Sequence, residues 1–218
     1  YRQSAERTPK MLRLDSDNIL LSCGPYQRLS AEMLRDQALA TSGLINTEVG
    51  GKWVKPYQPA GIWKELANQI GENKYRSSKG EDLYRRSIYA YWKRTIPPPV
   101  MLTFDASERA VCVVKRQSTS TPLQALVLLN DPQYLEASRA LAQSAMREGQ
   151  DEEAWVQFIF ERLTSRTPDD TELQDLLELL EQEMANYQAN PSAAKALLAI
   201  GESPLDKSLE ASNLAALT

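Results

Sequence analysis

The sequence predicts a mainly α-helical protein with a small β element inserted at residues 83–114. Apolar residues recur at helical spacing through most of the chain, whereas Leu83–Trp92 alternates with a period of two and is rich in aromatic residues, as strands are. In addition, a residue type that favours the N-cap of a helix precedes proline four times, at Thr121-Pro122, Asp131-Pro132, Thr167-Pro168 and Asn190-Pro191.

The first residues of the chain show no sustained period and contain a turn signal at Gly24-Pro25. We therefore expect an extended lead-in over residues 1–28 and a single mainly helical domain over residues 29–218. The 218-residue sequence lacks an initiator Met, and Leu209–Thr218 has the pattern of a helix that is cut in mid-course. We expect the sequence to be a fragment of a longer chain.

Two helices are expected before the middle of the chain. Ser30 is a suitable N-cap for the first, and Gly43 lies near its end. Its apolar face combines residues spaced by three or four positions: Leu34, Ala38, Thr41 and Ile45. A shorter amphipathic helix is expected over residues 62–70, because its apolar residues share one face and Gly71 follows them.

The middle of the chain predicts extended structure. The alternation of Leu83–Trp92 predicts a strand, and Val111–Val114 is a second, short strand candidate. Between them, Pro97–Pro99 must be extended, because proline fixes its backbone angle and has no backbone N–H to donate.

The chain after residue 121 predicts helices that begin at the proline pairs, and Gly149 and Gly201 stand where helices should end. Asp170, three residues after Thr167, completes a start that resembles a capping box. Two apolar stripes mark buried helix faces: Trp155, Val156, Ile159, Phe160 and Leu163 in one, and Leu173, Leu176, Leu177, Leu180, Met184 and Tyr187 in the other.

The absence of histidine restricts the chemistry that this chain can perform. It excludes a Ser-His-Asp or Cys-His catalytic set, a His-ligated metal and a covalently attached c-type haem. Cys23 and Cys112 could pair in an oxidising compartment or remain free, and two cysteines alone cannot form a thiolate metal site. We expect no cofactor in this chain, and whether it is an enzyme stays open; Asp105 and Glu108 are the carboxylates that a glycosidase would use.

Charge is distributed unevenly along the chain. Residues 74–116 contain 10 basic and 4 acidic side chains, whereas residues 131–218 contain 6 basic and 17 acidic ones. This contrast indicates either attraction between the two parts inside the fold or two faces for different partners. The apolar runs are far shorter than the roughly 20 residues that a membrane span needs, so we expect no membrane-spanning segment.

The basic segment is also aromatic, and residues 53–116 are therefore the candidate binding segment. Aromatic rings beside fixed cations suit neutral or anionic sugars and single-stranded nucleic acid, and the overall net charge of −4 argues against nucleic acid. The candidate ligand-binding residues are Tyr57, Arg85, Arg86, Tyr91, Trp92, Lys93, Arg94, Asp105 and Arg116. The alternative is structural: a strand that packs on helices, with Arg85, Arg86, Lys93 and Arg94 paired to the acidic C-terminal helices.

Five motifs occur in order and carry a family resemblance. They are Arg28–Leu44, Val54–Pro59, Asp82–Tyr89 with Trp92–Thr95, Pro97–Asp105 and Ser120–Gln133. Over about residues 12–218 the chain resembles a large bacterial domain of unknown function that is found C-terminal to cytochrome-c-like domains in planctomycete cell-surface proteins. The positions that match also include Thr121, Gln124, Asn130 and Asp131. No catalytic residue of the family can be carried over.

The resemblance implies export to the periplasm or cell surface, haem on a separate upstream domain, and an association with complex polysaccharides. Three functions follow as expectations. The first is a non-catalytic structural or interaction module of a larger envelope protein, which contacts other domains of the same polypeptide or a protein partner. The second is binding or modification of an anionic polysaccharide through residues 53–116. The third is docking for electron transfer with a haem domain.

Overall fold

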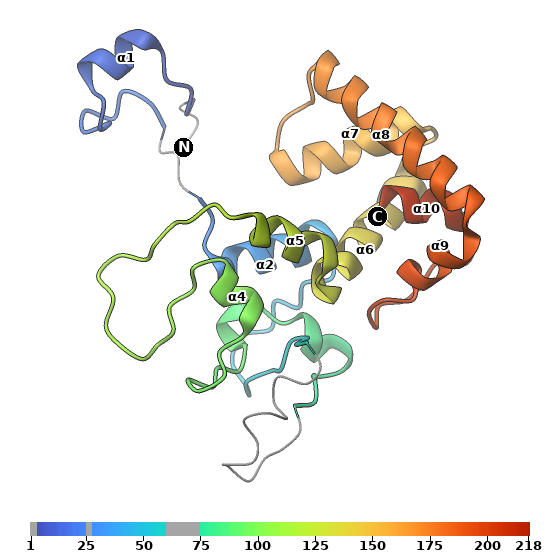
Figure 1. Ribbon diagram of the computed structural model, residues 1–218, viewed down its shortest axis with the longest axis horizontal. Helices are drawn as coiled ribbons and strands as arrows, with labels where there is room; N and C mark the ends of the chain where they lie inside the picture. The colour runs from blue at the N-terminus through green and yellow to red at the C-terminus, as the bar shows by residue number, and fades with distance from the viewer. Residues whose placement is uncertain (1–3, 25–27, 60–74) are drawn as a thin grey trace.

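The computed structural model describes residues 4–24, 28–59 and 75–218, and it confirms the mainly α-helical fold (Figure 1). The longest central element is α6 (Pro132–Glu148), which contacts α2 (Ala31–Thr41) and α5 (Pro122–Asn130) on one side. On its other side it contacts α7 (Glu152–Thr164), α9 (Pro191–Leu198) and α10 (Ala211–Leu217). The helix α6 therefore joins an N-terminal half to a C-terminal half.

The sequence predicted an extended lead-in, but the lead-in contains the short helix α1 (Pro9–Leu14). Thr8 caps this helix by accepting a hydrogen bond from the backbone N–H of Met11 at 3.3 Å, and Pro9 occupies the first helical position. Figure 1 shows α1 on an arm that lies apart from the other helices.

The first predicted helix is confirmed as α2, with Ser30 as its N-cap. The Ser30 hydroxyl accepts from the N–H of Met33 at 3.3 Å. The buried residues Ala31, Arg35 and Leu39 lie on the same face, one turn apart. The second predicted helix, over residues 62–70, lies outside the described residues.

The strand predicted over Leu83–Trp92 is wrong: the structure has two short 3₁₀ helices, η1 (Gly80–Tyr84) and η2 (Ser87–Tyr89). Isolated β-bridges connect Arg85 to Asn46 and Ala90 to Val54. A ladder does not form because the carbonyls of Leu83 and Arg85, which a neighbouring strand would need, accept hydrogen bonds from the Arg35 guanidinium. Side-chain hydrogen bonding has replaced sheet pairing here.

The second predicted strand, Val111–Val114, is also absent from the described structure. These residues lie in a loop between α4 (Pro99–Thr103) and α5, and the three valines are exposed. Within the described part of the chain, no strand lies beside them to supply a pairing edge. Valine's preference for strands depends on packing against neighbours, and this loop offers none.

Three of the four predicted helix starts are confirmed, because Thr121, Asp131 and Asn190 are the N-caps of α5, α6 and α9. The fourth is displaced: α8 (Asp170–Ala189) begins after Asp169, which is its N-cap in place of Thr167. Asp169 and Glu172 form a reciprocal capping box at 2.9 and 3.1 Å.

The start of α8 also contains an ion pair between Arg166 and Glu172. The Arg166 guanidinium donates to both carboxylate oxygens of Glu172 at 2.6 Å. Those hydrogen bonds, together with the one from the Asp169 backbone, lower the pKa of Glu172 to about 2. The acidic residue thus stays charged at the N-terminus of α8, where the helix dipole favours a negative charge.

Two apolar clusters support the two halves. The N-terminal cluster packs α2 against α4 and α6; its buried members are Ala31, Ala90, Met101, Phe104, Ala106 and Tyr134. The C-terminal cluster packs α6, α9 and α10; its buried members are Ala142, Ala194, Leu198, Leu214 and Ala215. Among the described residues, no helix is both long enough and apolar enough to span a membrane.

Candidate functional site

The nine predicted binding residues do not form one site. Their side chains lie in several places of the N-terminal half, and some of them are occupied by contacts within the protein. The geometry of each place decides which of these residues could still bind a ligand.

Arg85 lies inside the protein and fastens a loop. Its guanidinium donates to the carbonyls of Lys52 at 2.8 Å, Glu48 at 3.2 Å and Gly50, and it stacks 4.0 Å from the centre of the Tyr89 ring. These carbonyls and this ring occupy the planar face and the terminal N–H groups of Arg85. Its charge therefore holds the 48–52 loop against η2.

The other paired cations contact α2, not the acidic C-terminal helices that the structural alternative invoked. Arg86 lies 3.7 Å from Asp36, and Arg116 donates to Glu32 at 2.7 Å. Both arginines keep about half of their side-chain surface exposed, at 53% and 44%. These two ion pairs therefore connect the basic middle of the chain to the first long helix.

Asp105 and Arg116 line one cavity of about 430 Å³, in the loop between α4 and α5. Charged residues of both signs line it: Asp105, Glu108, Arg109, Lys115 and Arg116. Trp92 lies beside it, because its indole N–H donates to the Glu108 carbonyl at 3.2 Å and Arg109 stacks 4.6 Å from its ring. Asp105 is oriented by Thr119, whose backbone N–H and hydroxyl donate to its carboxylate at 2.7 and 2.9 Å.

Tyr91 belongs to a separate aromatic cluster with Trp53, Lys55 and Tyr75. The Lys55 ammonium lies 5.1 Å from the Trp53 ring, 5.3 Å from the Tyr91 ring and 5.6 Å from the Tyr75 ring. Sequence reasoning named Tyr91 alone. The spacing of Trp53 and Lys55, two residues apart in an extended segment, places both on one face and could have indicated the cluster.

Lys93 and Arg94 belong to a tight turn in which Ile96 N–H donates to the Lys93 carbonyl at 2.9 Å. Arg94 is exposed, and Lys93 is half-buried. Neither residue lines the cavity beside Trp92.

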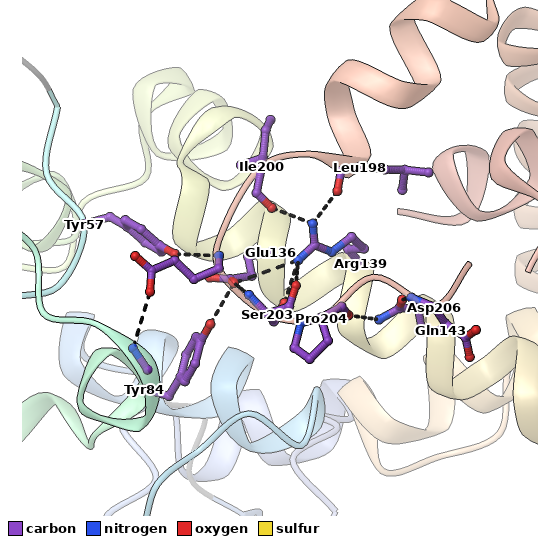
Figure 2. A network of polar contacts seen from close by, with 12 residues as sticks. Tyr57, Tyr84, Glu136, Arg139, Gln143, Leu198, Ile200, Ser203, Pro204 and Asp206 are labelled. Carbon is purple, nitrogen blue, oxygen red and sulfur yellow. Dashed lines mark hydrogen bonds and ion pairs between the residues drawn. The ribbon is translucent and has the colours of Figure 1, made fainter. Parts of the chain in front are cut away.

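Tyr57 joins a network around the fully buried Glu136 of α6 (Figure 2). The Tyr57 hydroxyl accepts from the N–H of Glu202 at 3.1 Å, and the Tyr84 hydroxyl donates to Glu136 at 2.8 Å. Burial, followed by the neighbouring Glu136 carboxylate, raises the pKa of both tyrosines. Tyr57 therefore connects the N-terminal half to the loop that follows α9.

Arg139 fastens the same loop one turn further along α6 (Figure 2). Its guanidinium donates to the carbonyls of Leu198, Ile200 at 2.7 Å and Ser203 at 2.8 Å, and to the Ser203 hydroxyl at 2.6 Å. It also lies 3.9 Å from Glu136. Because both charges are buried and share several partners, this network holds the 198–206 loop on α6.

Sequence reasoning also missed Arg35, which is 5% exposed and joins three segments. Its guanidinium donates to the carbonyls of Leu83 and Arg85 at 2.9 and 2.8 Å, to Ser87 Oγ at 3.2 Å and to Gln133 Oε1 at 3.1 Å. The signal was present in the sequence as an arginine on the same helix face as the buried Ala31 and Leu39.

The helix α5 buries a polar side chain and exposes apolar ones, which is the reverse of the usual arrangement. Its polar Gln124 is buried, where its side-chain amide donates to the Thr103 carbonyl at 2.8 Å and accepts from Arg28 at 2.7 Å. Its leucines face outward, with exposed fractions of 55% for Leu126 and 69% for Leu129. A solvated helix normally shows the opposite arrangement, so this face is suited to a partner.

Cys23 and Cys112 are both free; Cys23 is buried and Cys112 is exposed. In the described ranges, no group of three Cys, Asp or Glu side chains is placed to hold a metal ion.

Fold and sites together define a mainly helical domain in which buried arginines fasten loops, beside an outward apolar helix and two aromatic–cation sites. The model of the PSD1 family, described as a protein of unknown function (DUF1553), matches residues 1–180, and the chain belongs to this family. This confirms the expected membership of an uncharacterised domain family. No curated protein and no solved structure matches the chain.

Proposed function

We propose that this chain is a non-catalytic interaction module of a larger exported envelope protein, with any haem carried by a separate domain. Its partner is another domain of the same polypeptide or a second protein. The contact surface is the outward face of α5 together with the exposed valines of the 111–114 loop.

The inverted polarity of α5 is the observation that carries this proposal. Leu123, Leu126 and Leu129 of this nine-residue helix are all more than half exposed, while its glutamine is buried. Exposed apolar side chains that cluster on one helix are costly in water and are typical of surfaces that bind another protein. Residues 117–130 carry no charge, which matches the depletion of charge in the centre of protein interfaces.

Thiol labelling tests this surface. In a Cys112→Ser background, Leu126→Cys places a reactive thiol on α5, and Glu181→Cys places a matched thiol on the exposed face of α8. In the full-length protein with its partners, alkylation of the α5 thiol should be at least about tenfold slower than in the isolated chain, because a packed interface excludes the reagent. The α8 thiol should react equally in both.

Buried Cys23 reports unfolding in the same experiment, because it should react only when the fold opens. Equal alkylation rates of the α5 thiol in the full-length protein and the isolated chain would contradict the proposal.

A second candidate function is the binding of an anionic polysaccharide in the cavity beside Trp92. The observation that favours it is that Arg109 and Lys115 line a space of about 430 Å³ beside the Trp92 ring. Arg116 lines the same space but is paired with Glu32. Arginine and lysine recognise carboxylate or sulfate groups, and an aromatic ring can support the apolar face of a sugar.

Affinity electrophoresis tests this candidate. Polygalacturonate in the gel should retard the protein at low salt, where attraction between charges is weakly screened. The Arg109→Ser, Lys115→Ser double variant should lose most of that retardation, because it lacks two of the cations that line the cavity. The Lys10→Ser, Lys207→Ser double variant is the matched control for charge, since both exposed lysines lie outside the cavity. Equal retardation of the two double variants by polygalacturonate, each measured against a gel without the polymer, would refute polysaccharide binding at this cavity.

A further inference from the structure

Three aromatic rings surround one cation on the surface of the N-terminal half. The Lys55 ammonium lies within 5.6 Å of the ring centres of Trp53, Tyr75 and Tyr91. The Trp53 and Tyr91 rings are 4.8 Å apart and tilted by 46°, so they form two walls that meet at an angle. We call these three rings the aromatic cage.

The backbone holds the walls of the aromatic cage in place. Val54, between Trp53 and Lys55, donates to the Tyr89 carbonyl at 2.9 Å and accepts from the Tyr91 N–H at 2.7 Å. Tyr75 donates its hydroxyl to the Pro56 carbonyl at 2.6 Å. These hydrogen bonds fix the backbone that carries Trp53 and Tyr91, and the hydroxyl of Tyr75, without help from Lys55, which favours a preorganised cage.

The Lys55 side chain can move out of the aromatic cage, because few contacts hold its ammonium group there. In the described part of the chain its ammonium forms no ion pair and no hydrogen bond, and it contacts the three aromatic rings. The lysine is half-buried, and Trp53 is 59% exposed, so solvent reaches the cage. An ammonium group is compact and strongly hydrated, and water competes with the rings for it.

We propose that the aromatic cage is a binding site for a quaternary ammonium group, and that Lys55 occupies it in the free protein. Ring faces attract cations, and cages of aromatic rings are the established means of recognising quaternary ammonium ligands in proteins generally. A quaternary nitrogen has no N–H to keep hydrated and offers methyl groups to each wall, so it can replace the lysine ammonium. This site lies apart from α5 and does not depend on the interaction proposed for that helix.

The proposal makes Lys55 a competitor of the ligand. A ligand that binds only the open cage has its apparent affinity reduced by the fraction of molecules in which the cage is open. If Lys55 occupies the cage in about nine molecules of ten, its removal should increase the affinity about tenfold. An anion-binding site built on Lys55 would show the opposite effect, because loss of the cation would abolish binding.

The experiment is an NMR titration of the whole chain with tetramethylammonium, followed through the backbone amide signals of Val54 and Tyr91, which the wild type and all the variants retain. Lys55→Ala should bind about tenfold more tightly than the wild-type chain. Lys52→Ala, which removes an exposed lysine three residues away, should bind like the wild type. Trp53→Ala should lose saturable binding, and its fold should survive because the indole is largely exposed.

Charge and size controls complete the test. The neutral isostere of choline, 3,3-dimethylbutanol, should bind at least several-fold more weakly than choline, because a cation–π contact needs the positive charge. Equal affinity of Lys55→Ala and Lys52→Ala, or equal affinity for choline and its neutral isostere, would overturn the proposal. The α5 labelling experiment is independent of these titrations.

Discussion

Replacement of Arg35 by methionine is expected to lower the free energy of unfolding by about 3–5 kcal/mol, the largest single effect that we anticipate in this chain. Methionine keeps much of the apolar stem but removes the hydrogen bonds to the carbonyls of Leu83 and Arg85. Those buried carbonyls and Gln133 Oε1 would lose their donor without gaining contact with water. Urea unfolding followed by circular dichroism measures the change.

Arg86→Met is the matched control for Arg35→Met. Arg86 follows the same segment but is 53% exposed and lies 3.7 Å from Asp36. An exposed ion pair contributes little, so its loss should cost no more than about 1 kcal/mol. Similar costs for the two substitutions would show that the buried contacts of Arg35 do not hold η1 and η2 on α2.

The second large effect is expected at Gly201, where alanine should destabilise the fold by about 2–4 kcal/mol. Gly201 has a φ of +90°, a conformation that residues with a Cβ rarely adopt. A Cβ there would also lie 2.6 Å from Cγ and Oε1 of the buried Glu136. The Glu136 side chain cannot retreat without breaking its hydrogen bonds to Tyr84 and Ser203.

Gly50→Ala separates the two causes. Gly50 has nearly the same φ, +88°, but a Cβ there would meet no atom within 4 Å. Its substitution should therefore lower the free energy of unfolding only by the cost of placing a residue with a Cβ in this backbone conformation, about 1 kcal/mol. Thermal unfolding of both variants measures the difference, and an equal loss at the two glycines would mean that contact with Glu136 contributes nothing.

Local rules predicted the helices well because the information for them lies within a few residues. Ser30, Asp131 and Asn190 each cap the helix that their position predicted. The one displaced start, at Asp169, follows the same rule, since Glu172 three residues later makes it a better cap than Thr167.

Long-range polar contacts were beyond local rules. The alternation of Leu83–Trp92 resembles a strand, but Arg35, about 50 positions earlier, takes the carbonyls that a sheet would use. Long-range contacts also explain why the nine predicted binding residues do not lie in one site. Arg85 and Arg86 are adjacent in sequence, yet one fastens the 48–52 loop and the other faces α2. Neighbouring charges become separate when the backbone turns between them.

The aromatic cage shows the opposite case, because residues that are far apart in the sequence come together in the structure. Trp53, Tyr75 and Tyr91 span nearly forty positions of sequence, and the bridge between Val54 and Ala90 brings the first and last of them together. A count of aromatic residues in this segment indicated a binding region but could not select which rings meet.

The position of Glu136 has a consequence for how the molecule comes apart. One carboxylate oxygen receives the Tyr84 hydroxyl from the N-terminal half and the Ser203 N–H from the loop after α9 (Figure 2). Neither half can open without stripping a buried negative charge of a donor, which is costly in an apolar interior. The two halves are thereby tied into one cooperative unit, although each has an apolar cluster of its own.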